Sequence, residues 1–206
     1  MPSTKNKNYV LKITMRRFSP PNWCKVLVSG AMRFDELHEL IQDMFGFEGM
    51  HLHQFWVGDF TYSSMTNYFG RSMDWDDMED EAKLTVQKVF GTWRFSKIRY
   101  EYDFGDGWEF DIVCQKIADE APEDGNSQLL KRKGPNAIED CGGPWGLMDL
   151  YYIREHYDEI PPEKRSCLGW AWPDEFDEEG NRLPEEGENS EQDAKKSTKK
   201  SVSKKK

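Results

Sequence analysis

Residues 100–116 read YEYDFGDGWEFDIVCQK, two alternating runs on either side of a Gly-Asp-Gly turn. Large apolar side chains occupy every second position of both runs, and acidic side chains lie between them. A period of two predicts strands with one buried face, and the glycines around Asp106 favour a tight hairpin turn. We therefore expect a central β-hairpin with an aromatic core face made of Tyr100, Tyr102, Phe104, Trp108 and Phe110.

The other face of the predicted hairpin is acidic. It carries Glu101, Asp103, Glu109 and Asp111. Like charges across a strand pair are destabilising, so this face requires water, cations, a metal or raised carboxyl pKa values. An enzymatic interpretation would make Asp103 or Glu109 a general base. The sequence has no nucleophile elbow, phosphate-binding loop or dinucleotide fingerprint, so enzymatic activity is left open and a non-enzymatic role is favoured.

Apolar patterning before the hairpin predicts the start of the fold. Three segments alternate as strands and one shows the apolar spacing of a helix; in chain order these are strands 9–15 and 23–28, helix 34–45 and strand 51–57. This strand–strand–helix–strand order resembles the start of a β-grasp fold. We expect one α+β domain over residues 9–183, with a mixed or mainly antiparallel sheet.

Polar composition predicts loops at two places in that domain. Residues 63–83 and 119–134 are rich in acidic and turn-forming residues. The first segment is expected to be a long surface loop or a frayed helical turn, and the second a loop. His38 lies beside the apolar stripe of the predicted helix, where a packed or edge histidine is expected.

Charge is unevenly distributed along the 206 residues. Residues 184–206 hold five acidic residues and seven lysines, which leaves 33 acidic against 21 basic residues, a net charge of −12, in the rest. The segment before residue 9 is expected to be a flexible N-terminus, and residues 184–206 a disordered charged tail. An acidic body argues against nucleic-acid binding, which needs basic surface.

Cysteine usage and hydropathy suggest a compartment. The four cysteines are far apart with no C-x-x-C pair, and no apolar run approaches the roughly 18 residues of a membrane span. We therefore expect reduced thiols, no membrane association and a cytoplasmic location.

One polar constellation is the strongest candidate site. Its members are His51, His53, Asp103, Asp106, Glu139, Asp140 and Cys141. An H-x-H pair on a strand places two imidazoles on one face, so a divalent metal could be held by His51, His53 and Asp103, although no cofactor is required by any motif. The alternative is that the histidines pair with carboxylates while Asp106 and Asp140 accept turn amides.

A binding module uses neighbouring residues differently. The glycine-rich loop around residues 139–146, with Gly142, Gly143 and Trp145, would form a groove together with Trp108. Exposed aromatic rings beside carboxylates suit Lys or Arg side chains, so the expected partner is a protein or peptide, basic in character.

Four separated blocks together resemble one family. They are HLHQF at residues 51–55, YEYDFGDGWE at 100–109, EDCGGPWG at 139–146, and Phe176-Asp with Asn181 and Leu183. This combination resembles the plasmid pRiA4b ORF-3-like protein family, whose members are also found as passenger proteins of insertion elements. The resemblance implies an α+β fold and an uncharacterised protein associated with plasmids and mobile elements. We expect an accessory or protein-interaction module, and the alternative is a metal-dependent enzyme that uses the His/Asp/Glu cluster at the sheet edge.

Two departures from the family pattern bear on a metal site. The family usually has histidine where this chain has Phe110, and it often has a cysteine before the glycine-rich loop, where residues 131–136 have none. Both departures weaken a zinc interpretation.

Overall fold

The computed structural model describes residues 7–64 and 78–184. The chain divides into two compact units, Met1–Met148 and Asp149–Lys206, where the sequence predicts one domain over residues 9–183. The predicted charged tail, apart from Pro184, and the first six residues lie outside the described residues. None of the described helices is long and apolar enough to cross a membrane.

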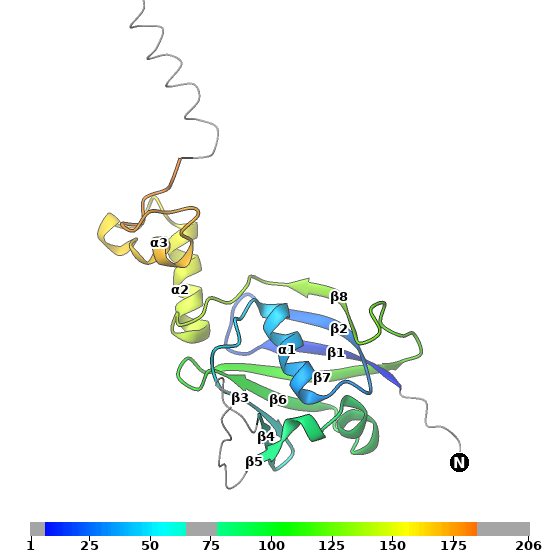
Figure 1. Cartoon of the computed structure of the whole chain (residues 1–206). Coiled ribbons are helices and arrows are strands. Elements are labelled where there is room, and N and C mark those ends of the chain that lie inside the picture. The colour runs from blue at the N-terminus through cyan, green and yellow to red at the C-terminus, as the bar shows by residue number, and fades with distance from the viewer. Residues whose placement is uncertain (1–6, 65–77, 185–206) are drawn as a thin grey trace, which may run out of the picture. The chain divides into compact units, whose positions relative to one another are not determined.

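The first unit is built on one sheet (Figure 1). Its strands in the described residues are β1 (Asn8–Met15), β2 (Trp23–Ser29), β3 (His53–Val57), β4 (Phe60–Ser63), β5 (Met78–Asp80), β6 (Lys97–Tyr102), β7 (Trp108–Ala118) and β8 (Ser127–Lys133). The order across the sheet is β5-β4-β3-β6-β7-β1-β2-β8, and every neighbouring pair except β4 and β5 is antiparallel. The expected α+β fold with a mixed, mainly antiparallel sheet is confirmed.

The predicted hairpin is β6 and β7, which lie in the middle of the sheet between β3 and β1. Tyr100, Tyr102, Trp108 and Phe110 are completely buried, which confirms the aromatic core face for these four rings. Phe104 does not belong to that face, because β6 ends at Tyr102 and Phe104 lies in the following loop with 42% of its surface exposed.

Helix α1 (Phe34–Phe45) follows β2, as the sequence predicts, and lies along one face of the sheet (Figure 1). Phe34 packs on Phe55 of β3 with ring centroids 4.8 Å apart, and Phe45 packs on Phe110 of β7 at 4.6 Å. Gly46 ends the helix in the left-handed conformation, with φ at 78°. The core of the first unit therefore lies between α1 and the aromatic face of the hairpin.

Both polar segments contain a strand, and residues 63–83 also contain a helical turn, as one of the two predictions for that segment expects. β8 occupies the second half of the 119–134 segment, because an edge strand needs a partner on one side only and leaves its polar side chains in solvent. Residues 65–77 of the other segment lie outside the described residues, but β5 and the short helix η1 (Glu81–Lys83) follow them. Helix η2 (Gln87–Thr92) then leads into β6.

The second unit is small and mainly helical. It holds most of α2 (Gly143–Glu155), which begins in the first unit, together with η3 (Pro162–Lys164) and α3 (Cys167–Ala171). Leu150, Leu168 and Phe176 are its buried apolar residues. Arg154 donates to the carboxylate of Glu175 through Nε and Nη2, and its guanidinium carbon lies 4.7 Å from the ring centre of Trp172. An ion pair and a cation–π contact of one arginine thus connect α2 to the segment that follows α3.

Candidate functional site

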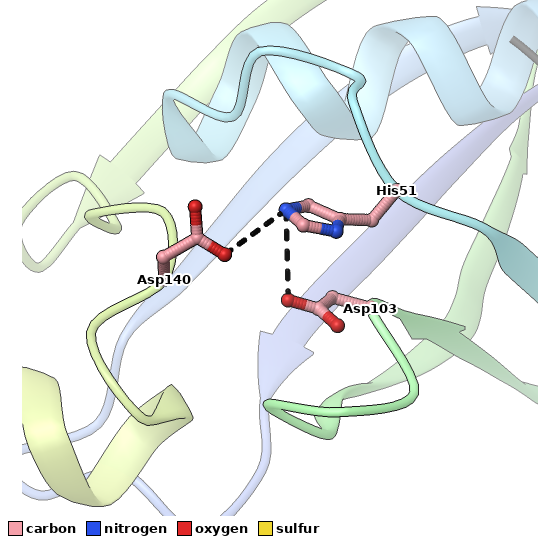
Figure 2. Close-up of side chains that lie close together, drawn as sticks. All are labelled: His51, Asp103 and Asp140. Carbon is pink, nitrogen blue, oxygen red and sulfur yellow. Dashed lines mark ion pairs between the residues drawn. The ribbon is translucent and has the colours of Figure 1, made fainter.

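One imidazole lies close to two carboxylates at one end of the central hairpin (Figure 2), and a third carboxylate, that of Glu139, approaches the same ring. Nε2 of His51 lies 3.3 Å from Oε2 of Glu139, 3.4 Å from Oδ1 of Asp140 and 3.8 Å from Oδ2 of Asp103. His51 precedes β3, Asp103 directly follows β6, and the other two residues belong to the loop before α2. We call these four residues the His51 cluster. The structure therefore brings together three segments that are far apart in sequence.

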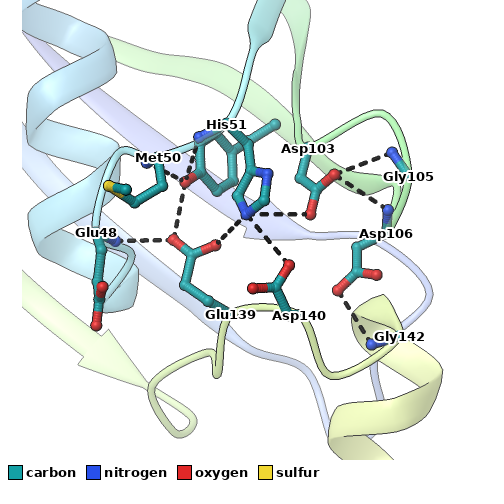
Figure 3. A network of polar contacts seen from close by, with 10 residues as sticks. Glu48, Met50, His51, Asp103, Gly105, Asp106, Glu139, Asp140 and Gly142 are labelled. Atoms are coloured by element: carbon teal, nitrogen blue, oxygen red, sulfur yellow. Dashed lines mark hydrogen bonds and ion pairs between the residues drawn. The ribbon is translucent and has the colours of Figure 1, made fainter. Parts of the chain in front are cut away.

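Asp103 is held by the hairpin loop that it begins. Its Oδ1 accepts hydrogen bonds from the backbone N–H groups of Gly105 and Asp106, at 3.0 and 3.3 Å, which leaves Oδ2 for His51 (Figure 3). Both Asp103 and Asp140 have positive φ angles, 52° and 55°. Left-handed backbone is sparsely populated for residues other than glycine, and such residues gather at functional sites.

Glu139 is held by Tyr102 and by backbone. Its Oε1 accepts a hydrogen bond from the Tyr102 hydroxyl and another from the backbone N–H of Glu48, both at 2.8 Å. The same hydroxyl accepts the N–H groups of Met50 and His51, at 3.0 and 3.3 Å. Burial, followed by the contact with Glu139, raises the pKa of Tyr102, so this hydroxyl keeps its proton and donates. Oε2 of Glu139 is consequently directed at His51.

Asp106 and the glycine loop join the hairpin to the segment before α2. Oδ2 of Asp106 accepts a hydrogen bond from the N–H of Gly142 at 3.1 Å (Figure 3). A side chain at Gly143 would place its Cβ 2.1 Å from the carbonyl oxygen of Asp106, so only glycine permits this close approach. The carboxylate of Asp106 therefore accepts a turn amide, as the alternative interpretation of the sequence expects, and is not directed at His51.

Cys141 lies next to the cluster in sequence but does not present a thiolate to it. Its Sγ donates to the carbonyl oxygen of Gly143 at 3.5 Å. Burial, with a further contribution from Asp106, raises the pKa of the thiol to about 12. A protonated thiol is a poor metal ligand and a poor nucleophile.

His53 belongs to a different, buried network. Its Nε2 lies 2.8 Å from a carboxyl oxygen of Glu81, and its ring stacks on His38 with centroids 3.5 Å apart. Nδ1 of His38 lies 2.7 Å from the Tyr100 hydroxyl, which also accepts a hydrogen bond from Gln42. The structure thus does not place His53 in the His51 cluster, although the sequence predicts one metal site for both histidines. His38 is buried, as expected.

The buried network is held in its neutral form. Burial lowers the pKa of His38 to about 2 and that of His53 to about 4. Burial, with smaller contributions from Asp35 and Asp80, raises the pKa of Glu81 to about 8. Near neutral pH the carboxyl group of Glu81 therefore carries its proton and donates it to Nε2 of His53, with little net charge in the core.

Among the residues expected at a partner surface, Trp108 and Trp145 lie in opposite environments. Trp108 is completely buried in the aromatic core, so its expected place in a binding groove is wrong. Trp145 is 63% exposed at the start of α2, directly after the tight turn of Gly142 and Gly143.

Comparison with known proteins gives the family. The model of the plasmid pRiA4b ORF-3-like protein family matches residues 7–182. The chain belongs to this family. The uncharacterized protein y4hQ of Sinorhizobium fredii (strain NBRC 101917 / NGR234) is 26% identical over 167 residues, which cover 81% of this chain and 82% of that relative.

A solved structure shares the fold. The crystal structure of a protein of unknown function, MM3350 from Methanosarcina mazei Go1, is similar with a TM-score of 0.66 and 25% sequence identity. The similarity covers 81% of this chain and 90% of that chain. The fold of this family member thus has a solved counterpart, and neither relative's name states an activity.

The sequence did not identify Glu81 as a site residue, and it predicted Tyr102 only as a core ring. Glu81 is one of many carboxylates in a segment without apolar periodicity, so nothing in the sequence marks it as buried. Tyr102 has the alternation of a core ring, and this pattern carries no information on its hydroxyl. A buried tyrosine hydroxyl usually requires a partner, which is the signal that could have connected Tyr102 to a nearby carboxylate.

Proposed function

We propose that this protein binds one divalent metal ion through His51, Asp103 and Asp140, and that the ion supports hydrolysis of a substrate. The observation that carries the proposal is the convergence of one imidazole nitrogen and two carboxylate oxygens, which lie within 4.8 Å of one another (Figure 2). Such a set fits the first coordination shell of one ion after small side-chain adjustments. Oε2 of Glu139 is a fourth candidate ligand or a hydrogen-bond partner of bound water.

The charge balance of the His51 cluster supports a cation. With all three carboxylates ionised, even a protonated His51 neutralises only one of three negative charges. The side chains of Asp103 and Glu139 are only 11% and 14% exposed, so water screens their repulsion incompletely. A divalent ion would compensate this charge. The ligand atoms are a nitrogen and oxygens, and such a mixed set suits Zn²⁺ or Mn²⁺.

Access from solvent supports catalysis over a purely structural ion. The side chain of Asp140 is 72% exposed and that of His51 is 30% exposed. Catalytic metal sites usually have three protein ligands and leave further positions for water or substrate. A bound ion would lower the pKa of such a water molecule and so supply a nucleophile.

The proposal is tested by calorimetric titration of the full chain with Zn²⁺, Mn²⁺ and Mg²⁺. We expect one ion per chain for at least one metal, and a loss of affinity of about ten-fold or more in His51→Ala and Asp140→Asn, since each removes one ligand. Asp43→Asn is the matched control, because Asp43 is an exposed carboxylate on α1 outside the cluster. Equal affinity in all four proteins would refute the metal site.

A second candidate function is a protein-interaction module, an accessory role supported by Trp145. This ring is exposed at the first turn of α2, beside a loop that also carries carboxylates. An exposed indole and nearby carboxylates suit a lysine- or arginine-rich peptide. The test is binding of a fluorescent oligoarginine peptide to metal-free protein. Trp145→Ala should weaken it, while Trp93→Ala, at another exposed tryptophan, should not.

A further inference from the structure

Three lysines stand side by side on the sheet face opposite α1. Lys12 of β1 pairs with Lys25 of β2, and Lys25 pairs with Lys131 of β8. Side chains alternate between the two faces of a strand, and the neighbours of Lys12, Leu11 and Ile13, are buried in the core. The three lysines therefore point away from the core, and neighbouring strands are about 5 Å apart.

A tryptophan and a fourth lysine lie in the next row. Trp23 of β2 pairs with Lys133 of β8. Nζ of Lys12 lies 5.0 Å from the centre of the Trp23 ring and Nζ of Lys25 lies 5.9 Å from it. We call Lys12, Lys25, Lys131 and Lys133, with Trp23, the lysine row.

The lysine row has no compensating charge. In the described part of the chain, none of its four ammonium groups has a carboxylate within 4.0 Å. The neighbouring basic residues on this face differ: Lys97 lies 2.8 Å from Asp111, and Arg17 lies 2.8 Å from Glu109. Like charges directly opposite one another across strands are destabilising. Four adjacent uncompensated cations on a chain with a net charge of −10 therefore require an explanation.

Protection of the sheet edge explains only part of the row. Charged side chains on an edge strand prevent pairing with another sheet, and β8 is an edge strand, so Lys131 and Lys133 fit that role. Lys12 and Lys25 lie on β1 and β2, which have partners on both sides. Edge protection does not account for these two lysines.

We propose that the lysine row binds single-stranded nucleic acid, with phosphates on the lysines and a base against Trp23. Proteins that bind single strands combine a cationic track for the backbone with aromatic rings for the bases. Lysine side chains are long and rotatable, so the two ammonium groups near Trp23 can turn to phosphates. The lysine row is short and the rest of the protein is acidic. A flexible single strand can follow the row alone, whereas a stiff duplex would also face the acidic surface and be repelled by it.

The net charge of the chain does not indicate this basic surface. The sequence argues against nucleic acid because the body is acidic, yet the acidic groups nearest to the row are paired with Lys97, Arg16 and Arg17. Local potential depends on which charges remain unpaired on one face. The inference is independent of the proposed metal site, because no residue of the His51 cluster belongs to the lysine row.

The test is fluorescence anisotropy of labelled oligothymidine with the full chain at low salt. We expect the variant Lys12→Glu/Lys25→Glu to bind about ten-fold or more weakly, since it removes two phosphate contacts and adds repulsion. The matched control is Lys88→Glu/Lys164→Glu, which changes the net charge equally. Lys88 also lies over a tryptophan, with its Nζ 4.9 Å from the ring centre of Trp93, but outside the row. Each variant retains the lysines beyond residue 184, so their contribution cancels.

Other probes decide between nucleic acid and other anions. Trp23→Leu should weaken oligothymidine binding about five-fold or more, since stacking contributes about 1–3 kcal/mol per base, and should leave binding of an abasic oligomer unchanged. Each of Lys131→Ala and Lys133→Ala should reduce the slope of log affinity against log salt by about 0.7. The proposal is overturned if the control double variant loses as much affinity, or if polyglutamate, phosphatidylserine vesicles or the abasic oligomer bind the wild type as tightly as oligothymidine does.

Discussion

His51 and His53 are two residues apart, yet they lie in opposite environments. The side chain of His51 is 30% exposed and faces three carboxylates. The side chain of His53 is 7% exposed, faces Glu81 alone and stacks on His38. Excess negative charge at a solvent-accessible imidazole favours binding of a cation. A buried imidazole with one balancing partner serves the packing of the core.

The contrast shows that an H-x-H pattern does not by itself define a metal site. The pattern predicts a strand with both imidazoles on one face, but β3 begins only at His53 and His51 lies before it. The segments that approach the two rings also differ: η1 reaches His53, while the hairpin loop and the loop before α2 reach His51. Which imidazole can act as a ligand is decided by these distant segments.

The largest predicted effect separates the two histidines by stability. His53→Ala should lower the free energy of unfolding by about 3–5 kcal/mol, because it leaves a cavity beside His38 and a buried Glu81 without its partner. His51→Ala should cost about 1 kcal/mol or less, since its ion pairs are partly exposed. Urea unfolding followed by circular dichroism measures both values. A larger loss in His51→Ala would invert the comparison.

The second largest predicted effect is the stabilisation by metal, which should depend on His51 and not on the buried network of His53. A ligand that binds only the folded state, at one hundred times its dissociation constant, stabilises that state by about 2.7 kcal/mol. We therefore expect Zn²⁺ or Mn²⁺ to raise the melting temperature of the wild type and of Glu81→Gln, but not of His51→Ala. A metal-dependent rise that survives in His51→Ala would place the ion elsewhere.

The third effect is a pH dependence that belongs to the buried network. The pKa of Glu81 is raised to about 8, so the stability from its neutral form is complete below pH 4.5 and is lost as the pH rises through 8. The pKa of His38 is lowered to about 2, so its contribution is complete above pH 6.5 and is lost only as the pH falls.

Burial also lowers the pKa of His53, to about 4, so both histidines oppose Glu81 as the pH falls through 6.5, and the effect of Glu81 dominates between about pH 7 and 8. There the wild type should lose up to about 1.4 kcal/mol of unfolding free energy per pH unit. Glu81→Gln cannot ionise and still donates a hydrogen bond to His53, so its unfolding free energy should fall less. Urea midpoints at pH 7 and 8 give the comparison, and parallel losses in the two proteins would mean that Glu81 is already ionised at pH 7.

Local patterns were sufficient to predict much of the fold. The alternation of the hairpin gave the central strands and four of the five expected core rings, and helical spacing gave α1 with its bounds. β8 was missed because an edge strand can be polar on both faces, and a polar stretch with turn residues is indistinguishable from a loop in a single sequence.

The candidate site was predictable in its members and not in their grouping. His51, Asp103, Glu139 and Asp140 were all candidates, because histidine and carboxylates beside glycine-rich turns are recognisable in the sequence. The separation of His53 depends on Glu81, and the braced position of Asp106 depends on the approach of Gly142. Both are contacts between distant segments, which a local pattern does not encode.

The smallest predicted effect extends the comparison to two tyrosines of β6. Tyr102 serves the His51 cluster through its hydrogen bond to Glu139, and Tyr100 serves the buried network through His38 and Gln42. Tyr102→Phe keeps the core ring and removes the hydroxyl, so it should cost about 1 kcal/mol of unfolding free energy, the usual net value of one hydrogen bond.

The same substitution should also affect metal binding, because Glu139 keeps only the backbone N–H of Glu48 to orient its carboxylate. Outer-shell partners of this kind typically contribute about ten-fold in metal affinity. Tyr100→Phe is the matched control: it removes the same atom two residues away and should leave metal affinity unchanged while lowering stability by a similar or larger amount. For each variant, calorimetric titration measures the metal affinity and urea unfolding measures the free energy of unfolding. Equal metal affinity in Tyr102→Phe and Tyr100→Phe would mean that Glu139 takes no part in binding the ion, and the site would then consist of His51, Asp103 and Asp140 alone.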